Sequence, residues 1–293
     1  MLILKIEHKS AETTVAMKIA VYSRDASVLS SPRLASMMER LDGRSFEFYQ
    51  VNTADEILPG TDMVMSVGGD GTFLSASKRV GDSGIPVIGV NLGRVGFLSE
   101  YSPEEVGEAL LSGAYSLEDR ALLKTTVDGD IIESETTFWP YSLNEISVLR
   151  CGAAILGIDV CIDGNPLPTY WADGLLVSTS SGSTAYSLSV GGPICVPGSK
   201  VLIISPIAPH NLNVRPLVVP DTTRITISMR SRDEKVTMSM DNRNALLSSS
   251  AVLEVGVAQF SLKRVRLEKS SFIKALTTKL FWGEDIRNSG EQW

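Results

Sequence analysis

The segment MVMSVGGDGTFLSASKRV, residues 63–80, constrains the fold more than any other part of the sequence. Its first residues are mostly apolar and favour a buried strand, whereas the residues from Thr72 onward favour a helix. Gly68, Gly69 and Gly71 lie between them and allow a close approach of the backbone to a ligand. In an open α/β sheet, ligands bind beyond the carboxyl ends of strands, where free N–H groups at a helix start favour phosphate. The segment therefore predicts a phosphate-donor loop formed by these glycines and Thr72.

Asp70 stands between these glycines, at the place where the phosphate is expected. The loop has neither the GxxxxGK[ST] lysine of a P-loop nor the GxGxxG spacing of a dinucleotide fold. A carboxylate repels phosphate unless a metal ion lies between them or the carboxylate accepts a proton from an attacking hydroxyl. We therefore interpret Asp70 as the base of a phosphoryl transfer. The alternative is a plain strand-to-helix turn in which Asp70 caps the helix.

The first part of the chain alternates short apolar runs with helical patterns, from Met17 to about Ser116. Such alternation is typical of βαβ units, so an open α/β nucleotide-binding domain is expected over residues 17–117. Residues 1–16 precede a second methionine and are interpreted as an N-terminal extension. The expected strands are KIAVYS, FEFYQV, MVMSV and IPVIGVN, and the expected helices cover residues 32–41 and begin near Thr72 and Pro103.

The pattern changes in the second half of the chain, where strand-like segments follow one another with turn signals between them. Segments such as RITISM and KVTMSM alternate as half-buried strands do, so a β-rich, sandwich-like domain is expected over residues 118–269. The closing SSFIKALTTKLFW returns to helical spacing, with Ser270 or Ser271 available as a cap. We expect this last helix to return to the first domain, so that residues 270–293 belong with residues 17–117. Its packing face is predicted to consist of Phe272, Ile273, Leu276 and Leu280.

The composition excludes several classes of function. No apolar run reaches the roughly 18 residues of a membrane-spanning helix, which argues against a membrane partner. The N-terminus is a poor signal peptide, so we expect a cytoplasmic protein. A net charge of −7 argues against a nucleic-acid partner, because nucleic acids are bound mainly by Lys and Arg. The cysteines form no CxxC pair, and His8 and His210 are the only histidines, so carboxylates are the stronger candidates for acid–base chemistry.

A second glycine-rich segment, GVNLGRVGFLSE at residues 89–100, follows the next expected strand. Ligand-binding loops in such folds lie at the carboxyl ends of the strands, so the two glycine loops are interpreted as two walls of one cleft. Arg94 lies in the second loop and would contact phosphate there. The alternative is an ordinary solvated loop arginine.

Two further segments carry unusual polar residues. Residues 178–183 supply many hydroxyl groups and lead into a helix-compatible run at 184–189. Such a loop binds a ligand through backbone N–H and hydroxyl groups together, or is merely a capped polar turn. Asn144 and Glu145 interrupt a strand pattern, so one of them should point inward and needs a partner. A ribose or a structural hydrogen bond would satisfy it.

Together these segments resemble the ATP-dependent NAD kinase family, and the resemblance extends from Met17 to Arg287. GGDG alone is shared with diacylglycerol and other lipid kinases, whereas the ordered set of motifs is specific. The motifs are GGDGT at 68–72, NLGRVGFL at 91–98, NE at 144–145, DGLLVSTSSGSTAYSLSVGGP at 173–193, PH at 209–210, RPLVVP at 215–220 and KLFWGED at 279–285.

The resemblance implies transfer of the terminal phosphate of ATP to the 2′-hydroxyl of the adenosine ribose of NAD, which yields NADP. It implies that Asp70 accepts the hydroxyl proton, with Gly71 beside it, and that Asn144 and Glu145 hold ribose and diphosphate groups. Asp173 would face the nicotinamide half of NAD. The rest of the pocket, including its adenine side, would be formed by Phe97, Ser181, Thr184, Ala185, Tyr186, Ser187, Leu188 and Ser189.

The resemblance also implies partners beyond NAD. Mg²⁺ would bridge the ATP oxygens and offset the repulsion between Asp70 and the triphosphate. ATP is the expected donor, and polyphosphate is an alternative donor. Family members form homodimers or homotetramers in which a neighbouring subunit completes the site, so a homo-oligomer is expected here.

Two departures from the family pattern are visible. Trp171 stands where bacterial relatives often carry a basic residue, and DNRN at 241–244 replaces the usual DGQ turn, which leaves the role of Arg243 open.

Two other functions compete with the kinase interpretation. A lipid or other small-molecule kinase would require an apolar acceptor pocket, and a non-catalytic NAD sensor would not require the intact Asp70.

Overall fold

A computed structural model describes residues 16–93, 96–134 and 138–283 of the chain. Most of the interpreted N-terminal extension, residues 1–15, lies outside the described residues, and so does Arg94. Within the described ranges, no helix is long and apolar enough to cross a bilayer.

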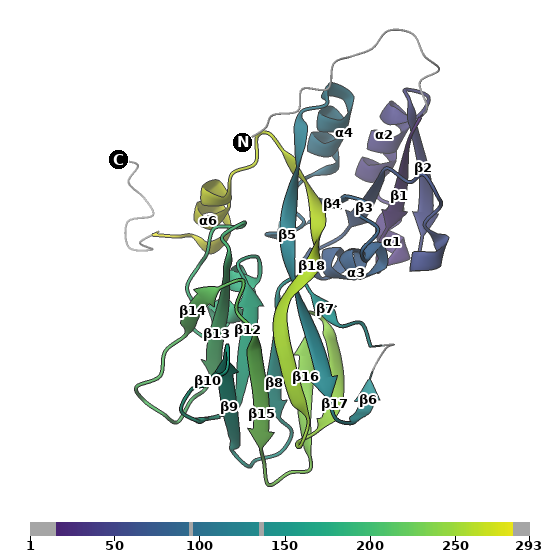
Figure 1. Cartoon of the computed structure of the whole chain (residues 1–293). Coiled ribbons are helices and arrows are strands. Elements are labelled where there is room, and N and C mark those ends of the chain that lie inside the picture. Colours follow the sequence, from purple (N-terminus) through teal and green to yellow (C-terminus); the bar gives the residue numbers. More distant parts are fainter. Residues whose placement is uncertain (1–15, 94–95, 135–137, 284–293) are drawn as a thin grey trace.

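The first domain is an open sheet of parallel strands with helices on both faces (Figure 1). Its elements are β1 (Met17–Tyr22), α1 (Ala26–Leu29), α2 (Pro32–Leu41), β2 (Phe46–Val51), the 3₁₀ helix η1 (Ala54–Glu56), β3 (Met63–Val67), α3 (Asp70–Val80), β4 (Val87–Val90) and α4 (Pro103–Ser112). The strand order is β4-β3-β1-β2, with α2 and α4 packed on one face and α3 on the other. The expected strands and helices are found, which confirms the α/β prediction.

Helix α3 begins at Asp70, two residues before the predicted start at Thr72. Gly69 is the N-cap and makes no side-chain capping bond. Gly68 has a φ of +146°, a conformation that favours glycine, and a Cβ there would approach the Thr72 hydroxyl to 2.5 Å. Asp70 is therefore the first helical residue and not the cap, so its carboxylate contacts groups outside the helix.

The second domain consists of two sheets packed face to face. Its elements, with the long strands that lead into and out of it, are β5 (Tyr115–Asp128), β6 (Ile131–Ser134), β7 (Tyr141–Ser142), β8 (Glu145–Arg150), β9 (Leu156–Ile162), β10 (Asn165–Pro166), β11 (Tyr170–Ala172), β12 (Gly174–Thr179), η2 (Gly182–Thr184), α5 (Tyr186–Ser189), β13 (Val201–Ile207), β14 (Leu217–Pro220), β15 (Ile225–Arg230), β16 (Lys235–Met240), β17 (Arg243–Ser248) and β18 (Val252–Leu267). The smaller, antiparallel sheet has the order β14-β13-β12-β8-β16-β17-β6. Val148 and Val177 of this sheet are buried against Ile158 and Leu253 of the larger one. This packing confirms the β-rich, sandwich-like prediction.

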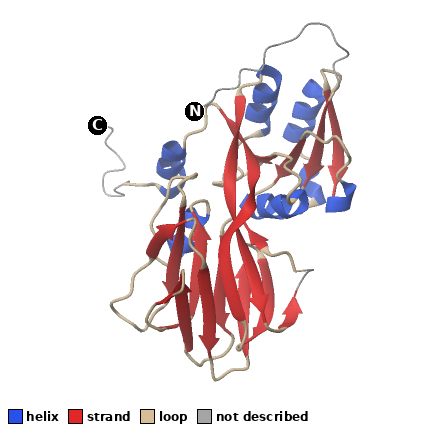
Figure 2. Cartoon of the chain, viewed as in Figure 1, coloured by secondary structure: helices blue, strands red, loops and turns tan. Residues whose placement is uncertain are grey.

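Two long antiparallel strands, β5 and β18, pass through both domains (Figure 2). They pair from Tyr115 opposite Leu267 at one end to Asp128 opposite Val252 at the other. β18 also pairs with β4 of the first domain and with β15 of the sandwich. The larger sheet is therefore continuous between the two domains, and the expected boundary at residues 117–118 falls within β5.

The last helix, α6 (Phe272–Leu280), docks against the loop that follows β4. The rings of Phe272 and Phe97 lie 6.2 Å apart. Just before the helix, the Ser270 hydroxyl donates to the Glu100 carboxylate at 2.8 Å. The expected return of the helix to the first domain is therefore observed.

The packing face of α6 agrees with the predicted one except at Ile273. Ser271 caps the helix by accepting the N–H of Lys274, as expected. Ile273, however, is 62% exposed, whereas Ala275 is buried. Phe272, Leu276 and Leu280 of the predicted face are half-buried, and Ile273 is exposed because it lies about 100° around the helix from Phe272, at the edge of the apolar stripe.

Ser102 at the start of α4 offers a test of local stability. Its hydroxyl accepts the N–H of Glu105 at 3.3 Å, and the Glu105 carboxylate accepts the N–H of Ser102 at 2.8 Å. Ser102→Ala should lower the free energy of unfolding by about 1 kcal/mol, because a helix N–H loses its acceptor. Urea denaturation measures the change, with Ser102→Thr as a control that keeps the hydroxyl. Equal losses in the two variants would contradict the capping role.

Candidate active site

The two glycine loops meet at the carboxyl ends of β3 and β4. These strands are parallel neighbours, and the N–H of Gly68 donates to the carbonyl of Val90 at 2.8 Å. The second loop then turns back, and the N–H of Asn91 donates to the carbonyl of Tyr101 at 2.7 Å. The loops interpreted as two walls of one cleft therefore lie side by side.

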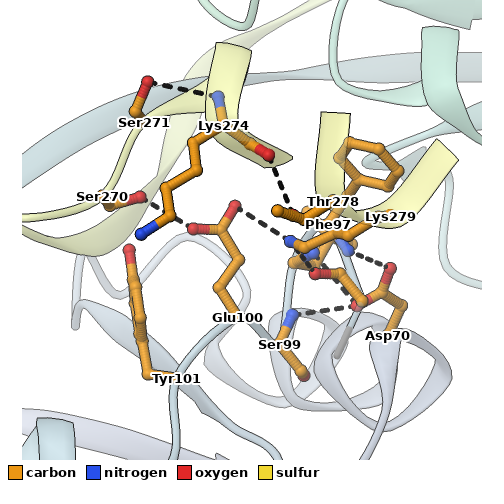
Figure 3. A network of polar contacts seen from close by, with 12 residues as sticks. Asp70, Phe97, Ser99, Glu100, Tyr101, Ser270, Ser271, Lys274, Thr278 and Lys279 are labelled. Atoms are coloured by element: carbon orange, nitrogen blue, oxygen red, sulfur yellow. Dashed lines mark hydrogen bonds and ion pairs between the residues drawn. The ribbon is translucent and has the colours of Figure 1, made fainter. Parts of the chain in front are cut away.

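The Asp70 carboxylate is held by consecutive backbone N–H groups of the second loop (Figure 3). Its Oδ2 accepts the N–H of Phe97 at 2.9 Å, and its Oδ1 accepts those of Leu98 at 3.0 Å and Ser99 at 2.8 Å. Gly96 lies so close that a Cβ on it would overlap the carboxylate. Asp70 thus joins the start of α3 to the loop after β4, in a space that requires glycine at position 96.

A second carboxylate, Asp241, holds consecutive N–H groups in the same way. From the turn between β16 and β17 it accepts the N–H groups of Leu143 at 2.9 Å, Asn144 at 2.8 Å and Glu145 at 3.3 Å. Desolvation raises the pKa of the Asp241 carboxyl, and these hydrogen bonds oppose the rise. Asp241 therefore fixes the backbone that presents Asn144 and Glu145.

Asn144 and Glu145 are both buried, at 6% and 8% exposed. Within the described residues, Asn144 Oδ1 and Glu145 Oε2 have no hydrogen-bond partner. Burial raises the pKa of Glu145 to about 8, and the nearby Asp241 contributes to the rise. Buried polar atoms normally have partners, so these oxygens are suited to donors on a bound ligand or water.

The DNRN turn connects the two domains across the cleft. Asn242 Nδ2 donates to the Gly71 carbonyl at 3.3 Å and to the Ser75 hydroxyl at 3.1 Å, both on α3. Arg243 instead donates to the Trp139 carbonyl at 2.7 Å, and its guanidinium lies 5.1 Å from the centre of the Trp139 ring. Arg243 therefore has a structural role, and Asn242 is the residue of this turn that reaches the Asp70 helix.

The Ser/Thr-rich segment after β12 forms η2 and α5, separated by Ala185, and not one continuous helix. The Ser181 hydroxyl accepts from Arg120 Nη1 at 3.1 Å. The Ser187 hydroxyl is buried without a partner in the described part of the chain. Ser181 and Thr184 line a cavity of about 130 Å³ whose other walls include Phe97, Arg120 and Arg264. The structure therefore brings Ser181, Thr184 and Phe97, which the resemblance assigns to one pocket, to the walls of one cavity.

Asp173 stands apart from these residues. It directly precedes β12, whereas Ser181 follows β12, and six strand residues separate the two ends by roughly 20 Å. Its carboxylate pairs with Arg150 Nε at 2.6 Å. The structure does not place Asp173 in the cleft of its own chain.

Sequence reasoning missed three cations beside the cleft, Arg120, Arg264 and Lys279. The Arg264 side chain is only 2% exposed, and its Nη1 lies 2.8 Å from Glu118 Oε1. Lys279 Nζ donates to the carbonyl of Gly96 in the second loop. Lys279 gives a signal, because it opens the closing KLFWGED motif, whereas Arg264 lies in the charged run LKRVRLEK at residues 262–269 and is not distinguished from Lys263 and Arg266.

The chain matches the model of the ATP-NAD kinase N-terminal domain over residues 4–113 and that of the ATP-NAD kinase C-terminal domain over residues 143–267. The chain belongs to the ATP-NAD kinase family. An NAD kinase of Bacteroides fragilis is 41% identical to this kinase over 252 residues, which cover 85% of this chain and 84% of that protein. An NAD kinase of Christiangramia forsetii is 34% identical to this kinase over 296 residues, which cover 93% of this chain and 100% of that protein.

Two solved structures resemble this kinase in fold. Yeast NADH kinase complexed with NADH has a TM-score of 0.79 at 23% identity, and the match covers 93% of this chain and 89% of that one. An NAD kinase from Archaeoglobus fulgidus in complex with ATP has a TM-score of 0.71 at 27% identity. That match covers 86% of this chain and 95% of the other chain. The family assignment makes this protein an enzyme that phosphorylates NAD with ATP, and confirms the kinase prediction.

The buried Glu145 predicts a pH dependence of stability. In the folded chain the Glu145 carboxyl keeps its proton up to about pH 8, whereas in the unfolded chain it releases the proton near its ordinary pKa of 4.5. Between these two pH values the folded state therefore binds more protons than the unfolded state. Raising the pH from 5 to 8 should therefore lower the free energy of unfolding, by roughly 2–4 kcal/mol from this group. Urea denaturation at both pH values should show a smaller loss in Glu145→Gln. The exposed Glu133→Gln is the control, and a wild-type pH dependence in Glu145→Gln would refute the assignment.

Proposed function

We propose that this kinase transfers the terminal phosphate of ATP to the 2′-hydroxyl of the adenosine ribose of NAD, with Asp70 as the general base. The position of the Asp70 carboxylate carries this proposal. It lies at the carboxyl end of β3, is held by three N–H groups, and stands beside the glycines of the phosphate-donor loop. A carboxylate held in this way is aligned before the substrate binds, and phosphoryl transfer is catalysed largely by alignment and charge neutralisation.

Asp70 retains the capacity to bind a substrate hydroxyl. An ionised carboxylate has about four lone-pair sites, and the loop N–H groups occupy two on Oδ1 and one on Oδ2. The remaining site on Oδ2 is proposed to accept the proton of the 2′-hydroxyl. The ribose oxygen then bonds to phosphorus, the bond between phosphorus and the bridging oxygen of ADP breaks, and the electron pair leaves with ADP.

NAD is proposed to bind where buried polar atoms lack partners. Asn144 Oδ1, Glu145 Oε2 and Ser187 Oγ are such atoms, and a ribose or amide group would supply hydrogen bonds to them. Glu145 is protonated below about pH 8, so it can also donate a hydrogen bond. The remaining proposed contacts within the chain are Gly71, Phe97, Ser181, Thr184, Ala185, Tyr186, Leu188 and Ser189, and Asp173 is proposed to contact NAD from a neighbouring subunit.

The ATP phosphates are proposed to lie over Gly68, Gly69, Gly71 and Thr72, at the N-terminus of α3, where the helix dipole and free N–H groups favour anions. Arg94 of the adjacent loop is proposed to contact them. Mg²⁺ is proposed to enter bound to the ATP phosphates, as part of the substrate, and to neutralise charge that builds up on them. Polyphosphate is the alternative donor to be compared with ATP.

A homodimer or homotetramer is proposed because Asp173 lies far from the cleft of its own chain. In an oligomer, Asp173 would complete the site of a neighbouring subunit. Exposed apolar side chains on and beside β14, the edge strand of the smaller sheet, offer a surface for such contact: Leu212, Leu217 and Val218. We further propose that the kinase acts in the cytoplasm, where its free cysteines stay reduced.

Asp70→Asn tests the proposed function. The amide keeps the shape of the side chain but cannot accept a proton, and its NH2 group loses at least one of the loop hydrogen bonds, so kcat should fall roughly 10²- to 10⁴-fold. The dissociation constant for NAD should stay within about threefold, because Asn144 and Glu145 are unchanged. The assay supplies NAD, ATP and Mg²⁺ and couples product to an enzyme that reports only NADP; calorimetry measures NAD binding.

The exposed Asp82→Asn is the matched control and should keep wild-type kcat. Wild-type kcat in Asp70→Asn would remove Asp70 from the role of base. Folded wild-type protein that binds NAD but forms no NADP would instead favour a sensor. Replacing ATP by polyphosphate in the same assay defines the donor.

A further inference from the structure

Consecutive peptide groups of the second glycine loop have hydrogen-bond partners on both sides. On one side, the N–H groups of Phe97, Leu98 and Ser99 donate to the Asp70 carboxylate. Each peptide group joins the carbonyl of one residue to the N–H of the next, so the carbonyls on the other side belong to Gly96, Phe97 and Leu98. Each of these carbonyls accepts a hydrogen bond from a cationic side chain. The loop therefore lies as a single layer between an anion and two cations.

The cations come from two elements near the end of the chain. Arg264 Nη2 on β18 donates to the carbonyls of Leu98 at 3.2 Å and Phe97 at 3.5 Å. Lys279 on α6 donates to the carbonyl of Gly96, and Figure 3 shows it reaching from the helix to the loop that contacts Asp70. The two cationic side chains are 2% and 14% exposed. In such surroundings a cation polarises a carbonyl, and the polarised peptide becomes a stronger N–H donor.

Glutamates hold both cations in place. Glu100 Oε1 lies 3.3 Å from Arg264 Nη2 and 3.8 Å from Lys279 Nζ. Glu118 Oε1 lies 2.8 Å from Arg264 Nη1, and Ser270 donates to the Glu100 carboxylate. The cations therefore have counter-ions besides the loop carbonyls, and these fix their positions relative to the loop.

We propose that Lys279 and Arg264 are positioning residues for phosphoryl transfer, acting on Asp70 through the peptide groups between residues 96 and 99. This inference rests on the proposed role of Asp70 as the base. Because α6 carries Lys279, the base is correctly aimed only when the last helix is docked on the first domain. The cost of misplacement is large, since an error of about 1 Å at a reacting group can reduce a rate 100-fold.

Lys279→Met tests the proposal, because methionine keeps the unbranched chain but cannot donate to Gly96. The kcat should fall roughly 10- to 100-fold, whereas KM for NAD should stay within about threefold, since Asn144 and Glu145 are untouched. Lys279→Arg still donates and should recover most of the loss. Lys274→Met is the matched control, because Lys274 is an exposed lysine on the same helix, and should keep wild-type kcat.

A double variant separates positioning of the base from general loosening of the fold. If Lys279 acts through Asp70, the double variant Asp70→Asn, Lys279→Met should have the same kcat as the single variant Asp70→Asn. The base is already lost in the single variant, so misplacing it has no further effect. Wild-type kcat in Lys279→Met, an equal loss in Lys274→Met, or losses that multiply in the double variant would each overturn the inference. Full activity of Asp70→Asn alone would overturn the proposed function instead, so the two failures are distinguishable.

Discussion

The contact between the Asp70 carboxylate and the N–H groups of residues 97–99 shapes the candidate active site. It ties the first residue of α3 to a loop 27 to 29 residues further along the chain. Hydrogen bonds to a charged acceptor are short and strong, and the N-terminus of α3 adds a favourable dipole for the same carboxylate. Without Asp70, these loop N–H groups would lose their acceptor, and the end of the second glycine loop would lose its connection to α3.

The fold uses this arrangement twice. Asp241 accepts hydrogen bonds from the N–H groups of residues 143–145, and it lies in a turn about a hundred residues further along the chain. One carboxylate thus fixes the second glycine loop of the α/β domain, and another fixes the segment of the sandwich that carries Asn144 and Glu145. Asn242 then joins the two domains by hydrogen bonds to Gly71 and Ser75. The geometry of an NAD kinase site therefore depends on backbone groups as much as on side chains.

Local patterns are sufficient to predict the strands, most helices, the glycine loops and the position of Asp70 between strand and helix, because strand-to-helix turns and apolar periodicity are encoded by neighbouring residues. The start of α3 was placed two residues late, since Gly69 caps the helix by its backbone conformation alone. Ile273 fits the apolar spacing of α6 but lies about 100° around the helix from Phe272, at the edge of the docking face, and is exposed. Lys279 could not be connected with Gly96, from which 183 residues separate it, because no short-range pattern encodes such a contact.

The ribbon of β5 and β18 runs unbroken from the α/β sheet into the sandwich, apart from a register shift between Val257 and Ser261. The two strands are paired on both sides of this shift, so a large rotation of one domain against the other would break ladder hydrogen bonds. Closure by a large hinge rotation, as in many two-domain enzymes, is therefore disfavoured. Helix α6 lies outside the ribbon, joined to β18 by residues 268–271 and docked on the loop after β4 through Phe272 and Lys279, so it can undock without breaking the ladder.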